Sequence, residues 1–298
     1  MANIHVISGG TSDERAVSLR SGAAVAAGLE AAGHSVRILD SATIGIDEIA
    51  AADAVFLALH GAGGEDGTVQ AQLETRDVKF VGTDSVASAL CFDKWRYRQF
   101  VQTDLPLPDG ALVTLDEFSG HPLSQQPFVL KPFDGGSSVD TFIIRDVQSI
   151  PVEAVRASFD KHGKMLLEQL IVGIELTVGV LIDKAIGIVE IIPPSDGEFD
   201  YENKYNGMTQ ELCPPEHLSA TVQAEARKLA ETAHRITGCR DFSRTDLMLE
   251  QSSGKLFVLE TNTIPGMTDQ SLFPKAALSA GITMSQLCDQ LVQLALRR

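Results

Sequence analysis

The chain has 298 residues, of which 44% are hydrophobic and 21% charged, so it is long enough to bury a substantial core and to form two or three lobes. It carries 24 Lys and Arg against 40 Asp and Glu, and the resulting net charge of −16 argues against nucleic acid or an anionic membrane as the main partner. A small anionic ligand stays compatible with this charge, because one pocket can be basic on an acidic protein.

Cysteine usage and the N-terminus both predict a cytoplasmic protein. The four cysteines form no CxxC pair, which is typical of reduced thiols and not of a disulfide framework or a zinc site. The opening residues MANIHVISGG lack a basic segment followed by a long apolar one, so they predict a first β-strand and no signal peptide. No run approaches the ~18 apolar residues that a membrane helix needs, so we expect no membrane partner.

The first ninety residues alternate strand and helix patterns. An Ala-rich helical pattern over 15–32 ends at Gly33, which is a suitable C-terminal cap. Short apolar runs predict strands at 4–7, 36–39, 54–59 and 78–81. We expect the second and third of these strands to be buried. Strands separated by helices imply a parallel sheet, in which ligands bind at the carboxyl ends of the strands.

The middle of the chain is rich in β-structure. A helix predicted over 93–102 leads into a Pro-containing stretch at 105–110, which is a candidate lobe boundary. Beyond it, strands are predicted at 128–130, 141–144 and 164–170.

The C-terminal part combines strands with two helices. Apolar residues at 222, 226, 229, 233 and 236 predict an amphipathic helix, and Thr283 with Gln286 has the spacing of a capping box at the start of a final helix. Strands are predicted at 242–249, at 256–260, and as a pair joined by a turn over 175–192. We expect three lobes, at residues 1–90, 91–170 and 171–298.

Common nucleotide and hydrolase fingerprints are absent from the sequence. It has no GxxxxGK[ST] motif and no GxGxxG after a strand, so any nucleotide is held by another architecture. HExxH and GxSxG are also missing, which argues against a zinc peptidase and an α/β-hydrolase. The chemistry must therefore come from other clusters, of which there are three.

The first cluster is the segment KPFDGGSS at 131–138. A cation at the end of a strand, followed by a Gly/Ser turn, suits phosphate, because backbone amides and hydroxyls donate hydrogen bonds while Lys131 supplies the charge. A hairpin turn with a surface lysine has the same composition, so that alternative stays open.

The second cluster lies on two neighbouring strands. Glu260 and Asn262 are two residues apart, so in a strand they share a face, and Asp246 across from them would complete three oxygen ligands. Such a set suits Mg²⁺ bound together with substrate phosphates. Arg244 would face the same way and could meet developing negative charge. The alternative is a salt-bridge network around Arg244, although inward-facing acidic side chains are costly to bury without a partner.

The third cluster is HGAGGEDG at 60–67, which follows a buried strand. Several glycines after a strand indicate close approach of the backbone, and Gly67 could begin a helix whose N-terminus faces the site. His60 stands at the carboxyl end of its strand, where a parallel sheet binds ligands. A purely structural histidine is an equally good interpretation.

These clusters belong to six longer segments, GGTSDERAVSLRSG (9–22), LHGAGGEDGTVQAQLE (59–74), KPFDGGSSV (131–139), DYENKYNGMTQELCPP (200–215), SRTDLML (243–249) and LETNTIPGMTDQSL (259–272). In this order they resemble the D-alanine–D-alanine ligases of the ATP-grasp superfamily, over essentially the whole chain. The resemblance implies an α/β fold, with an N-terminal parallel-sheet (Rossmann-like) lobe followed by a two-lobed ATP-grasp fold. One such segment is a weak signal, whereas six in order are a strong one.

The resemblance also implies a reaction. Such enzymes use ATP to phosphorylate the carboxylate of one D-alanine, and the amine of a second D-alanine attacks the acyl phosphate. The products are D-alanyl-D-alanine for peptidoglycan precursors, ADP and phosphate. The implied cofactors are ATP and two Mg²⁺ ions, for which Mn²⁺ can substitute, and the implied assembly is a homodimer.

Matching positions extend the resemblance to the first D-alanine. Glu14 would hold its ammonium group, in a hydrogen-bonded triad with Ser137 and Tyr205. His60 would lie near the same molecule. The segment that contains Tyr205 is the natural lid, since the acyl phosphate must be kept from water.

Other matching positions concern the remaining ligands. Arg244 and the Gly266 amide would form the oxyanion site, and Ser271 and the Leu272 amide would bind the carboxylate of the second D-alanine. The implied nucleotide and metal residues are Lys94, Lys131 and Lys204 for the ATP phosphates, Glu168 and Glu175 for adenine and ribose, Ile171 for a backbone contact, and Asp246, Glu260 and Asn262 for Mg²⁺.

The sequence departs from the family pattern in a few places. Asp140 stands where the family usually has Gly, and a carboxylate beside the phosphate loop would repel ATP unless it points away. Ser243 and Thr245 are less usual neighbours of Arg244, although the arginine itself is kept.

Three other functions compete with the main interpretation. Ligases that join D-alanine to D-lactate or D-serine are the nearest, but depsipeptide ligases generally lack the tyrosine that stands here at 205. A non-catalytic nucleotide-binding regulator would have lost Arg244 or a metal ligand. A different ATP-grasp carboxylate–amine ligase would not need the segments around Glu14 and 266–272, which suit D-alanine.

Overall fold

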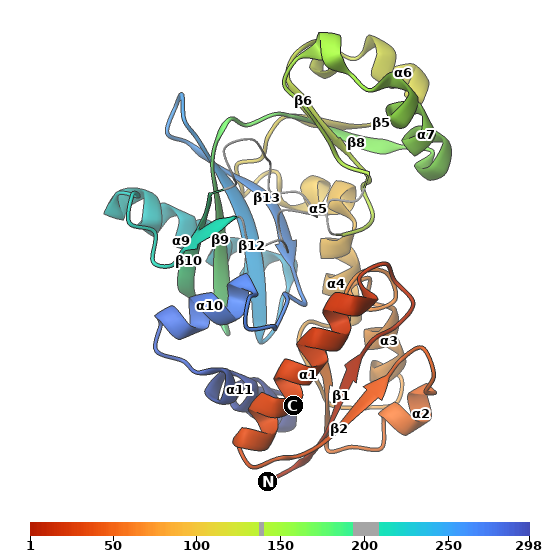
Figure 1. Ribbon diagram of the computed structural model, residues 1–298, viewed down its shortest axis with the longest axis vertical. Coiled ribbons are helices and arrows are strands. Elements are labelled where there is room, and N and C mark those ends of the chain that lie inside the picture. The colour runs from red at the N-terminus through yellow and green to blue at the C-terminus, as the bar shows by residue number, and fades with distance from the viewer. Residues whose placement is uncertain (137–139, 193–208) are drawn as a thin grey trace.

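The computed structural model describes residues 1–136, 140–192 and 209–298, and this part of the chain contains three β-sheets (Figure 1). One sheet is parallel and two are antiparallel. Their strands fall within residues 1–90, 91–170 and 171–298 respectively, while the lobe boundaries themselves stay a prediction. The mixed α/β fold with a parallel sheet first confirms the predicted fold class.

The N-terminal sheet has the strand order β2 (Ser35–Asp40), β1 (Asn3–Ser8), β3 (Ala54–Leu57) and β4 (Phe80–Val81), all parallel. The helices α1 (Arg15–Ala31), α2 (Ile46–Ile49) and α3 (Thr68–Glu74) alternate with these strands. Most of β1 and all of β3 are buried, but β2 is an edge strand whose Ile38 is 50% exposed. The prediction of a buried strand at 36–39 was therefore wrong, because an apolar run does not distinguish an edge strand from a central one.

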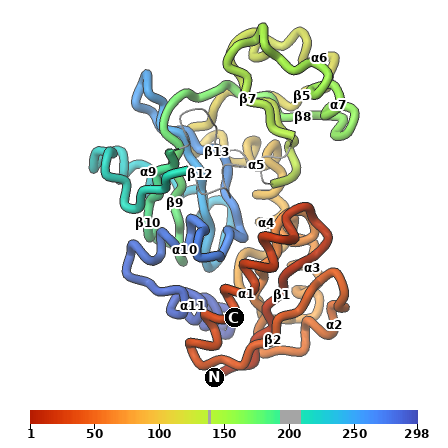
Figure 2. The backbone as a smooth tube through the Cα atoms, viewed as in Figure 1, coloured from red at the N-terminus to blue at the C-terminus, as the bar shows by residue number. Residues whose placement is uncertain are grey.

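The last helix of the chain packs on this first sheet. α11 (Met284–Arg297) contacts α1, β3 and β4, and its buried leucines share one core with Ile4 and Phe56. Figures 1 and 2 show the blue α11 beside the red α1. The predicted capping box at Thr283 is present. The two ends of the chain are thereby joined in one hydrophobic core.

The second sheet lies at the opposite end of the molecule (Figure 1). Its antiparallel order is β5 (Gly110–Val113), β8 (Met165–Gln169), β6 (Phe128–Lys131) and β7 (Phe142–Ile144). The ring of Phe118 in α6 (Leu115–Gly120) lies 5.5 Å from that of Phe128 and 5.6 Å from that of Phe159 in α7 (Val152–His162). Two short 3₁₀ helices complete this part, at Pro122–Gln125 and Val147–Ser149.

The third sheet is the largest, with the antiparallel order β11 (Gln210–Leu212), β10 (Lys184–Ile192), β9 (Gly173–Leu181), β12 (Phe242–Glu250) and β13 (Leu256–Asn262). α9 (Ala220–Thr237) covers one face and buries Ala226, Ala230 and Ala233, which confirms the predicted amphipathic helix. The helices α4 (Ser85–Phe92) and α5 (Lys94–Val101) connect this face to the N-terminal sheet.

The opposite face of the third sheet carries α10 (Leu272–Ser279). Two glycines allow the helix to lie close, since a Cβ at Gly187 would be 2.8 Å from the carbonyl oxygen of Ala276, and one at Gly179 would be 3.2 Å from the ring of Phe273. The start of α10 is thus held against the sheet.

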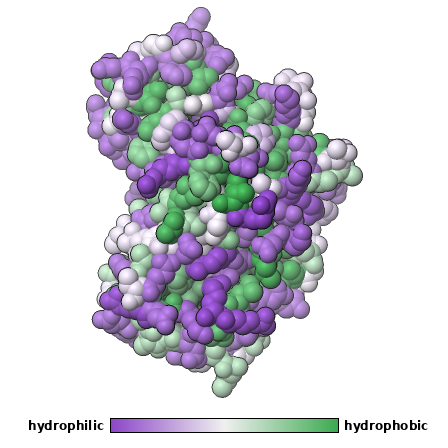
Figure 3. Space-filling model, turned by 180° about the vertical axis from the view of Figure 1, so that it is seen from behind, coloured by the Kyte–Doolittle hydropathy of each residue, from purple (hydrophilic) through white to green (hydrophobic). Residues whose placement is uncertain are grey.

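The surface is mostly hydrophilic, as the view from behind shows (Figure 3), with smaller groups of hydrophobic residues near its middle. Within the described ranges, no helix combines the length and the apolar character needed to cross a membrane.

Candidate active site

Two adjoining cavities, of about 830 and 680 Å³, lie between the three sheets. The larger extends from α1 and His60 to the start of α10, and the smaller extends along the end of β8 and the start of β9. A molecule in one cavity would meet a molecule in the other at their common wall. The described residues that line both cavities are Glu14, Lys94, Gly135, Gly136, Asp246 and Glu260.

Opposed residues of β12 and β13 form part of this wall. Asp246 pairs with Glu260 and Arg244 pairs with Asn262 in the antiparallel register, so all four side chains lie on one face of the sheet. All four also line the larger cavity. The strand-face argument made from the sequence is confirmed as geometry, while the role of these residues as metal ligands stays a prediction.

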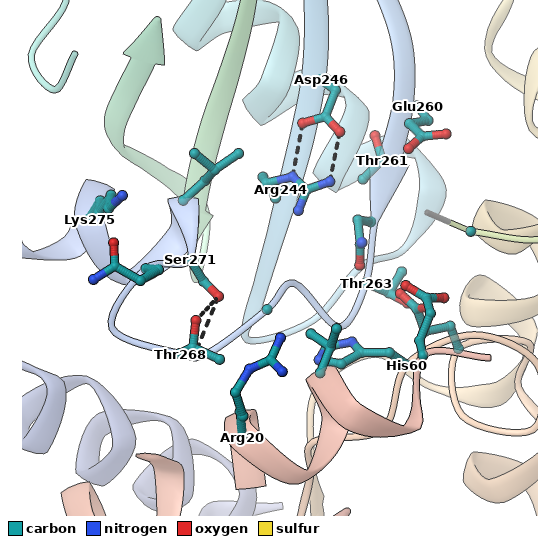
Figure 4. Close-up of a pocket in the computed structure, with 18 of the residues that line it drawn as sticks. Arg20, His60, Arg244, Asp246, Glu260, Thr261, Thr263, Thr268, Ser271 and Lys275 are labelled. Atoms are coloured by element: carbon teal, nitrogen blue, oxygen red, sulfur yellow. Dashed lines mark hydrogen bonds and ion pairs between the residues drawn. The ribbon is translucent and has the colours of Figure 1, made fainter. Parts of the chain in front are cut away.

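The carboxylates on this wall are paired with cations. Arg244 Nε and Nη2 donate to the two oxygens of Asp246 at 2.9 and 2.7 Å (Figure 4), and Thr177 Oγ1 donates to Asp246 Oδ1 at 2.6 Å. Burial works to lower the pKa of Arg244, but Asp246 outweighs it, so the pKa is raised and the guanidinium stays charged. Lys94 Nζ lies 3.2 Å from Glu260 Oε2.

The salt-bridge network that was the alternative to a metal site is therefore present, and the same residues still fit Mg²⁺. Two carboxylates and the amide of Asn262 form an all-oxygen donor set of the kind that hard cations prefer. Cationic nitrogens already lie against these carboxylate oxygens, which shows that the wall attracts positive charge. Across the described part of the chain, no group of three or more His, Cys, Asp or Glu residues forms a metal cluster.

Lys131 and Glu168 form a buried pair beside the smaller cavity. Lys131 Nζ lies 2.6 Å from Glu168 Oε2, and Arg98 Nη1 lies 2.7 Å from Glu168 Oε1. Burial lowers the pKa of Lys131, but Glu168 and then Glu260 outweigh it, so the pKa is raised and the ammonium group persists. The carboxylate of Glu168, predicted to bind the nucleotide, is thus engaged by two cations, and its predicted role is untested.

One part of the smaller cavity is lined by apolar side chains beside the carboxylate of Glu175. Ile171 and Glu175 both line it, together with Met248 and Leu259 from the facing strands. An apolar slot of this kind with a polar group at one side suits a flat heterocycle attached to a sugar.

Glu14 reaches two glycine loops from the start of α1. Its Oε2 atom would lie 3.0 Å from a Cβ at Gly61 and 2.7 Å from a Cβ at Gly136, so a larger residue at 136 would displace the Glu14 carboxylate. Ser137, predicted to bond with Glu14, follows directly in the chain but lies outside the described residues, as do Tyr205 and Lys204.

Glu65 is a site residue that the sequence reasoning missed. Its Oε2 accepts a hydrogen bond from the amide of Gly61 at 2.6 Å, and the residue lines the larger cavity. Burial, and then the negative charge of Glu14, raises the pKa of Glu65 to about 8. Its place within the glycine-rich segment after a strand was the available signal.

His60 is buried at the carboxyl end of β3 and lines the larger cavity. Its Nε2 atom lies 3.1 Å from Ser21 Oγ of α1. Burial, and then the charge of Arg244, lowers the pKa of His60 to about 4, so the ring is neutral near pH 7. His60 therefore makes a structural contact with α1 and also lines the cavity, so both interpretations that the sequence left open agree with its position.

The loop before α10 brings Gly266 against Ser271. A Cβ at Gly266 would lie 2.7 Å from Ser271 Oγ, and that oxygen accepts a hydrogen bond from the Thr268 amide at 3.0 Å. α10 begins at Leu272, whose amide lies in the first turn and has no hydrogen-bond acceptor within the helix. Arg20 and Lys275, which the sequence did not single out, line the same cavity (Figure 4).

Asp140 lines the smaller cavity and is bonded to two side chains of α7. Its φ is +55°, a conformation that favours glycine, and its Oδ2 lies 2.7 Å from Lys161 Nζ and 2.8 Å from His162 Nε2 of α7. Hydrogen bonds from His162 and then from Lys161 lower the pKa of the Asp140 carboxyl. Lys161 therefore offsets part of the negative charge through which Asp140 would repel ATP.

Comparison with known proteins extends the geometric description. Residues 102–293 match the family model of the D-ala D-ala ligase C-terminus, and residues 39–83 match that of the D-ala D-ala ligase N-terminus. The chain belongs to the D-alanine–D-alanine ligase family. The family recognised from six sequence segments is thereby confirmed.

Relatives in this family match the chain over its full length. A D-alanine–D-alanine ligase from Xanthobacter autotrophicus is 40% identical in an alignment 302 positions long, which covers 98% of this chain and 97% of that protein. The crystal structure of D-alanine–D-alanine ligase from Bacillus anthracis complexed with ATP has a TM-score of 0.85 at 28% identity, covering 100% of this chain and 98% of that one. VanG D-Ala:D-Ser ligase from Enterococcus faecalis has a TM-score of 0.82 at 27% identity, covering 98% and 99%. The ATP-grasp fold is therefore shown, and this chain is a ligase.

Proposed function

We propose that the chain joins two D-alanine molecules to D-alanyl-D-alanine through a D-alanyl phosphate, at the expense of ATP, for peptidoglycan precursors in the cytoplasm. The observation that carries this proposal is the wall shared by two cavities, which is lined by Lys94, Asp246 and Glu260. ATP in the smaller cavity would present its γ-phosphate there to a D-alanine in the larger one. The family membership supports the same assignment. A homodimer stays an expectation from that membership.

The reaction at the wall is a phosphoryl transfer followed by an acyl transfer. A carboxylate oxygen of the first D-alanine attacks the γ-phosphorus and ADP leaves. The amine of the second D-alanine then attacks the carbonyl carbon, loses a proton, and phosphate leaves with the original carboxylate oxygen. Activation is required because a free carboxylate offers only hydroxide or oxide as a leaving group.

Cations at the wall lower the barrier to phosphoryl transfer. Lys94, Lys131 and Lys204 would offset charge on the phosphates, and Asp246, Glu260 and Asn262 would hold Mg²⁺. The bound Mg²⁺ supplies positive charge to the phosphate oxygens. Arg244 would meet the oxyanion of the tetrahedral intermediate, beside the Gly266 amide.

The larger cavity would position the two D-alanines. Glu14, with Ser137 and Tyr205, would hold the first ammonium group, close to the neutral His60. Ser271 and the amide of Leu272 at the start of α10 would bind the second carboxylate, because a helix N-terminus favours negative charge.

The smaller cavity would hold the nucleoside. Glu175 would bind ribose, and a backbone group of Ile171 would bind the adenine edge. Glu168 would act on the adenine side, and it also holds in place the ammonium group of Lys131, which is assigned to the phosphates. The apolar faces of Met248 and Leu259 would enclose the ring.

The experiment is product analysis by mass spectrometry with the purified chain, ATP and Mg²⁺. D-alanine alone should yield the dipeptide and release phosphate, while L-alanine should yield neither. Product formation only with D-lactate or D-serine present would move the protein to a ligase of mixed products. No product in any mixture, with ATP still bound, would favour a nucleotide-binding regulator.

A further inference from the structure

Three buried hydroxyl groups form a chain behind the shared wall. Tyr97 Oη of α5 lies 2.8 Å from Thr261 Oγ1 of β13, which lies 3.1 Å from Thr245 Oγ1 of β12. Tyr97 is 1% exposed, Thr261 is 2% exposed and Thr245 is fully buried, so water does not compete for these bonds. The chain of hydroxyls thus connects one helix to two strands inside the protein.

The two threonines alternate with the proposed metal ligands. Thr245 directly precedes Asp246 and Thr261 directly follows Glu260, and the two threonines are paired in the register. Successive residues of a strand face opposite sides, so a bond between the threonines sets how their neighbours face the cavity. The register shifts directly after Asp246, between Asp246 and Leu247. Regular strand pairing therefore flanks Asp246 and Glu260 on one side only. The hydrogen bond between the two threonines adds a restraint directly beside these two residues.

The third hydroxyl connects this pair to Lys94. Tyr97 lies three residues after Lys94 in α5, and residues at that spacing share a helix face. Lys94 Nζ donates to the carbonyl oxygen of Gly135 at 2.7 Å and lies 3.2 Å from Glu260 Oε2. Two links therefore join α5 to β13, one through a charge in the cavity and one through hydroxyls behind it.

The hydroxyl chain has a distinct counterpart on the same strand. Ser243 is also buried on β12, but its Oγ bonds His234 Nδ1 of α9 at 2.7 Å. Burial raises the pKa of Tyr97 well above its ordinary value, so the phenol keeps its proton and remains a donor. A buried hydroxyl that lost its hydrogen-bond partner would cost free energy, so each of these bonds stabilises the contact between the two elements that it joins.

We propose that Tyr97 is a positioning residue: through Thr261 and Thr245 it holds Asp246 and Glu260 in register with Lys94 for binding of a metal–nucleotide complex. The inference rests on the proposed function, because only there do Asp246 and Glu260 hold a metal ion. It assigns a task to Thr245, which the resemblance left unexplained.

The test compares variants that lose a hydroxyl and little else. Tyr97→Phe and Thr261→Val break the chain, Thr261→Ser keeps it, and Ser243→Ala removes the counterpart hydroxyl as the matched control. The dissociation constant of Mn²⁺ is measured with saturating ADP, from the paramagnetic resonance of free Mn²⁺, and the melting temperature is measured in parallel. We expect the constant to rise about tenfold in Tyr97→Phe and Thr261→Val, and less than about twofold in the other two.

The outcomes separate a positioning role from a structural one. If Tyr97→Phe and Ser243→Ala weaken Mn²⁺ binding equally, or if neither does while melting temperatures fall, the hydroxyl chain only stabilises the fold and the inference is overturned. Should Tyr97→Phe fail to fold, Thr261→Val against Thr261→Ser gives the same decision. A wild-type chain that binds no Mn²⁺ with ADP would overturn the proposed metal site itself, which is a different result from wild-type binding with unchanged variants.

Discussion

Arg244 is held by Asp246 through two hydrogen bonds, at 2.9 and 2.7 Å, on the wall between the cavities. The guanidinium is thus held at the wall before any ligand arrives. A preorganised cation of this kind acts on charge that develops during the reaction more than on ground-state binding.

For Arg244→Ala, we expect turnover to fall by about 10²-fold or more, while the KM for ATP stays within a few-fold, because the oxyanion loses its cation and the nucleotide cavity does not. Steady-state kinetics with saturating D-alanine measures both quantities. Arg244→Lys is the contrast, since it keeps the charge without the two-pronged geometry. Wild-type turnover in Arg244→Ala would contradict the oxyanion role.

Glu65 makes stability depend on pH. Its pKa is raised from 4.5 to about 8 in the folded chain, so the folded state favours the neutral carboxyl. The stabilisation is complete below about pH 4.5 and is lost as the pH rises through about 8. Glu65→Gln keeps a neutral group, so its melting temperature minus that of the wild type should increase between about pH 5 and about pH 9.

Scanning calorimetry at several pH values checks this prediction for Glu65. The exposed Glu153→Gln is the control for replacing a glutamate by glutamine. A difference that is constant for Glu65→Gln would show that the carboxyl ionises in the folded chain as it does in the unfolded one.

Asp140 combines an unfavourable backbone conformation with favourable pairing. At φ +55°, Asp140→Gly relieves the conformation and loses the ion pairs, whereas Asp140→Ala loses the pairs and keeps the strain. Because Lys161 is 60% exposed, the ion pair contributes little, and we expect the alanine variant to be less stable than the glycine variant by about 1 kcal/mol. Urea unfolding measures the difference in the free energy of unfolding. An alanine variant as stable as the glycine variant would show that the backbone at residue 140 is not strained.

At the residue scale, the sequence predicted contacts that follow from local geometry. The shared face of Glu260 and Asn262 follows from strand alternation, and the place of His60 follows from the end of its strand. The ion pair of Glu168 with Lys131 and the raised pKa of Glu65 could not be predicted in this way. They arise from burial and from neighbours distant in sequence, which only the folded chain brings together.

At the scale of elements, α10 is positioned by the glycines beneath it. Gly187→Ala would place a Cβ 2.8 Å from the backbone oxygen of Ala276, so the helix that carries Ser271 and Leu272 must move. We expect the KM for the second D-alanine to rise several-fold, with the KM for ATP nearly unchanged, because the nucleotide cavity lies elsewhere.

Initial rates over a range of D-alanine concentrations test the effect of Gly187→Ala. Gly120→Ala is the matched control, since a Cβ at that glycine meets nothing within 4 Å. Equal D-alanine kinetics in both variants would show that the position of α10 does not control the second substrate.

Elements with a strong periodic signal were predicted well, and others were not. The apolar residues along one side of α9, and the alternation along β12 and β13, each identify a face that must be buried. The helix and the two strands are all present. α7 and α10 were not predicted, because helices of 11 and 8 residues span only about two or three turns, over which a period is hard to recognise. The exposure of β2 depends on its place at the edge of the sheet, which no local run encodes.

At the scale of the whole molecule, the three sheets create the site by meeting. The common wall takes residues from α1, α5, the loop after β6 and strands β12 and β13. The amphipathic pattern of α11 predicted a helix but not its partner, and the helix packs on the N-terminal sheet at the other end of the chain. Such contacts depend on chain topology, so the sequence pattern could not predict them.

The central claim is that a carboxylate in the larger cavity receives the γ-phosphoryl group of ATP at the shared wall. The most direct measurement uses D-alanine labelled with ¹⁸O in its carboxylate, and mass spectrometry of the phosphate released during dipeptide formation. If the acyl phosphate forms, each phosphate carries one ¹⁸O atom, because the attacking carboxylate oxygen leaves with it. Dipeptide formation with unlabelled phosphate would contradict this account, since the carboxylate would then be activated in another way.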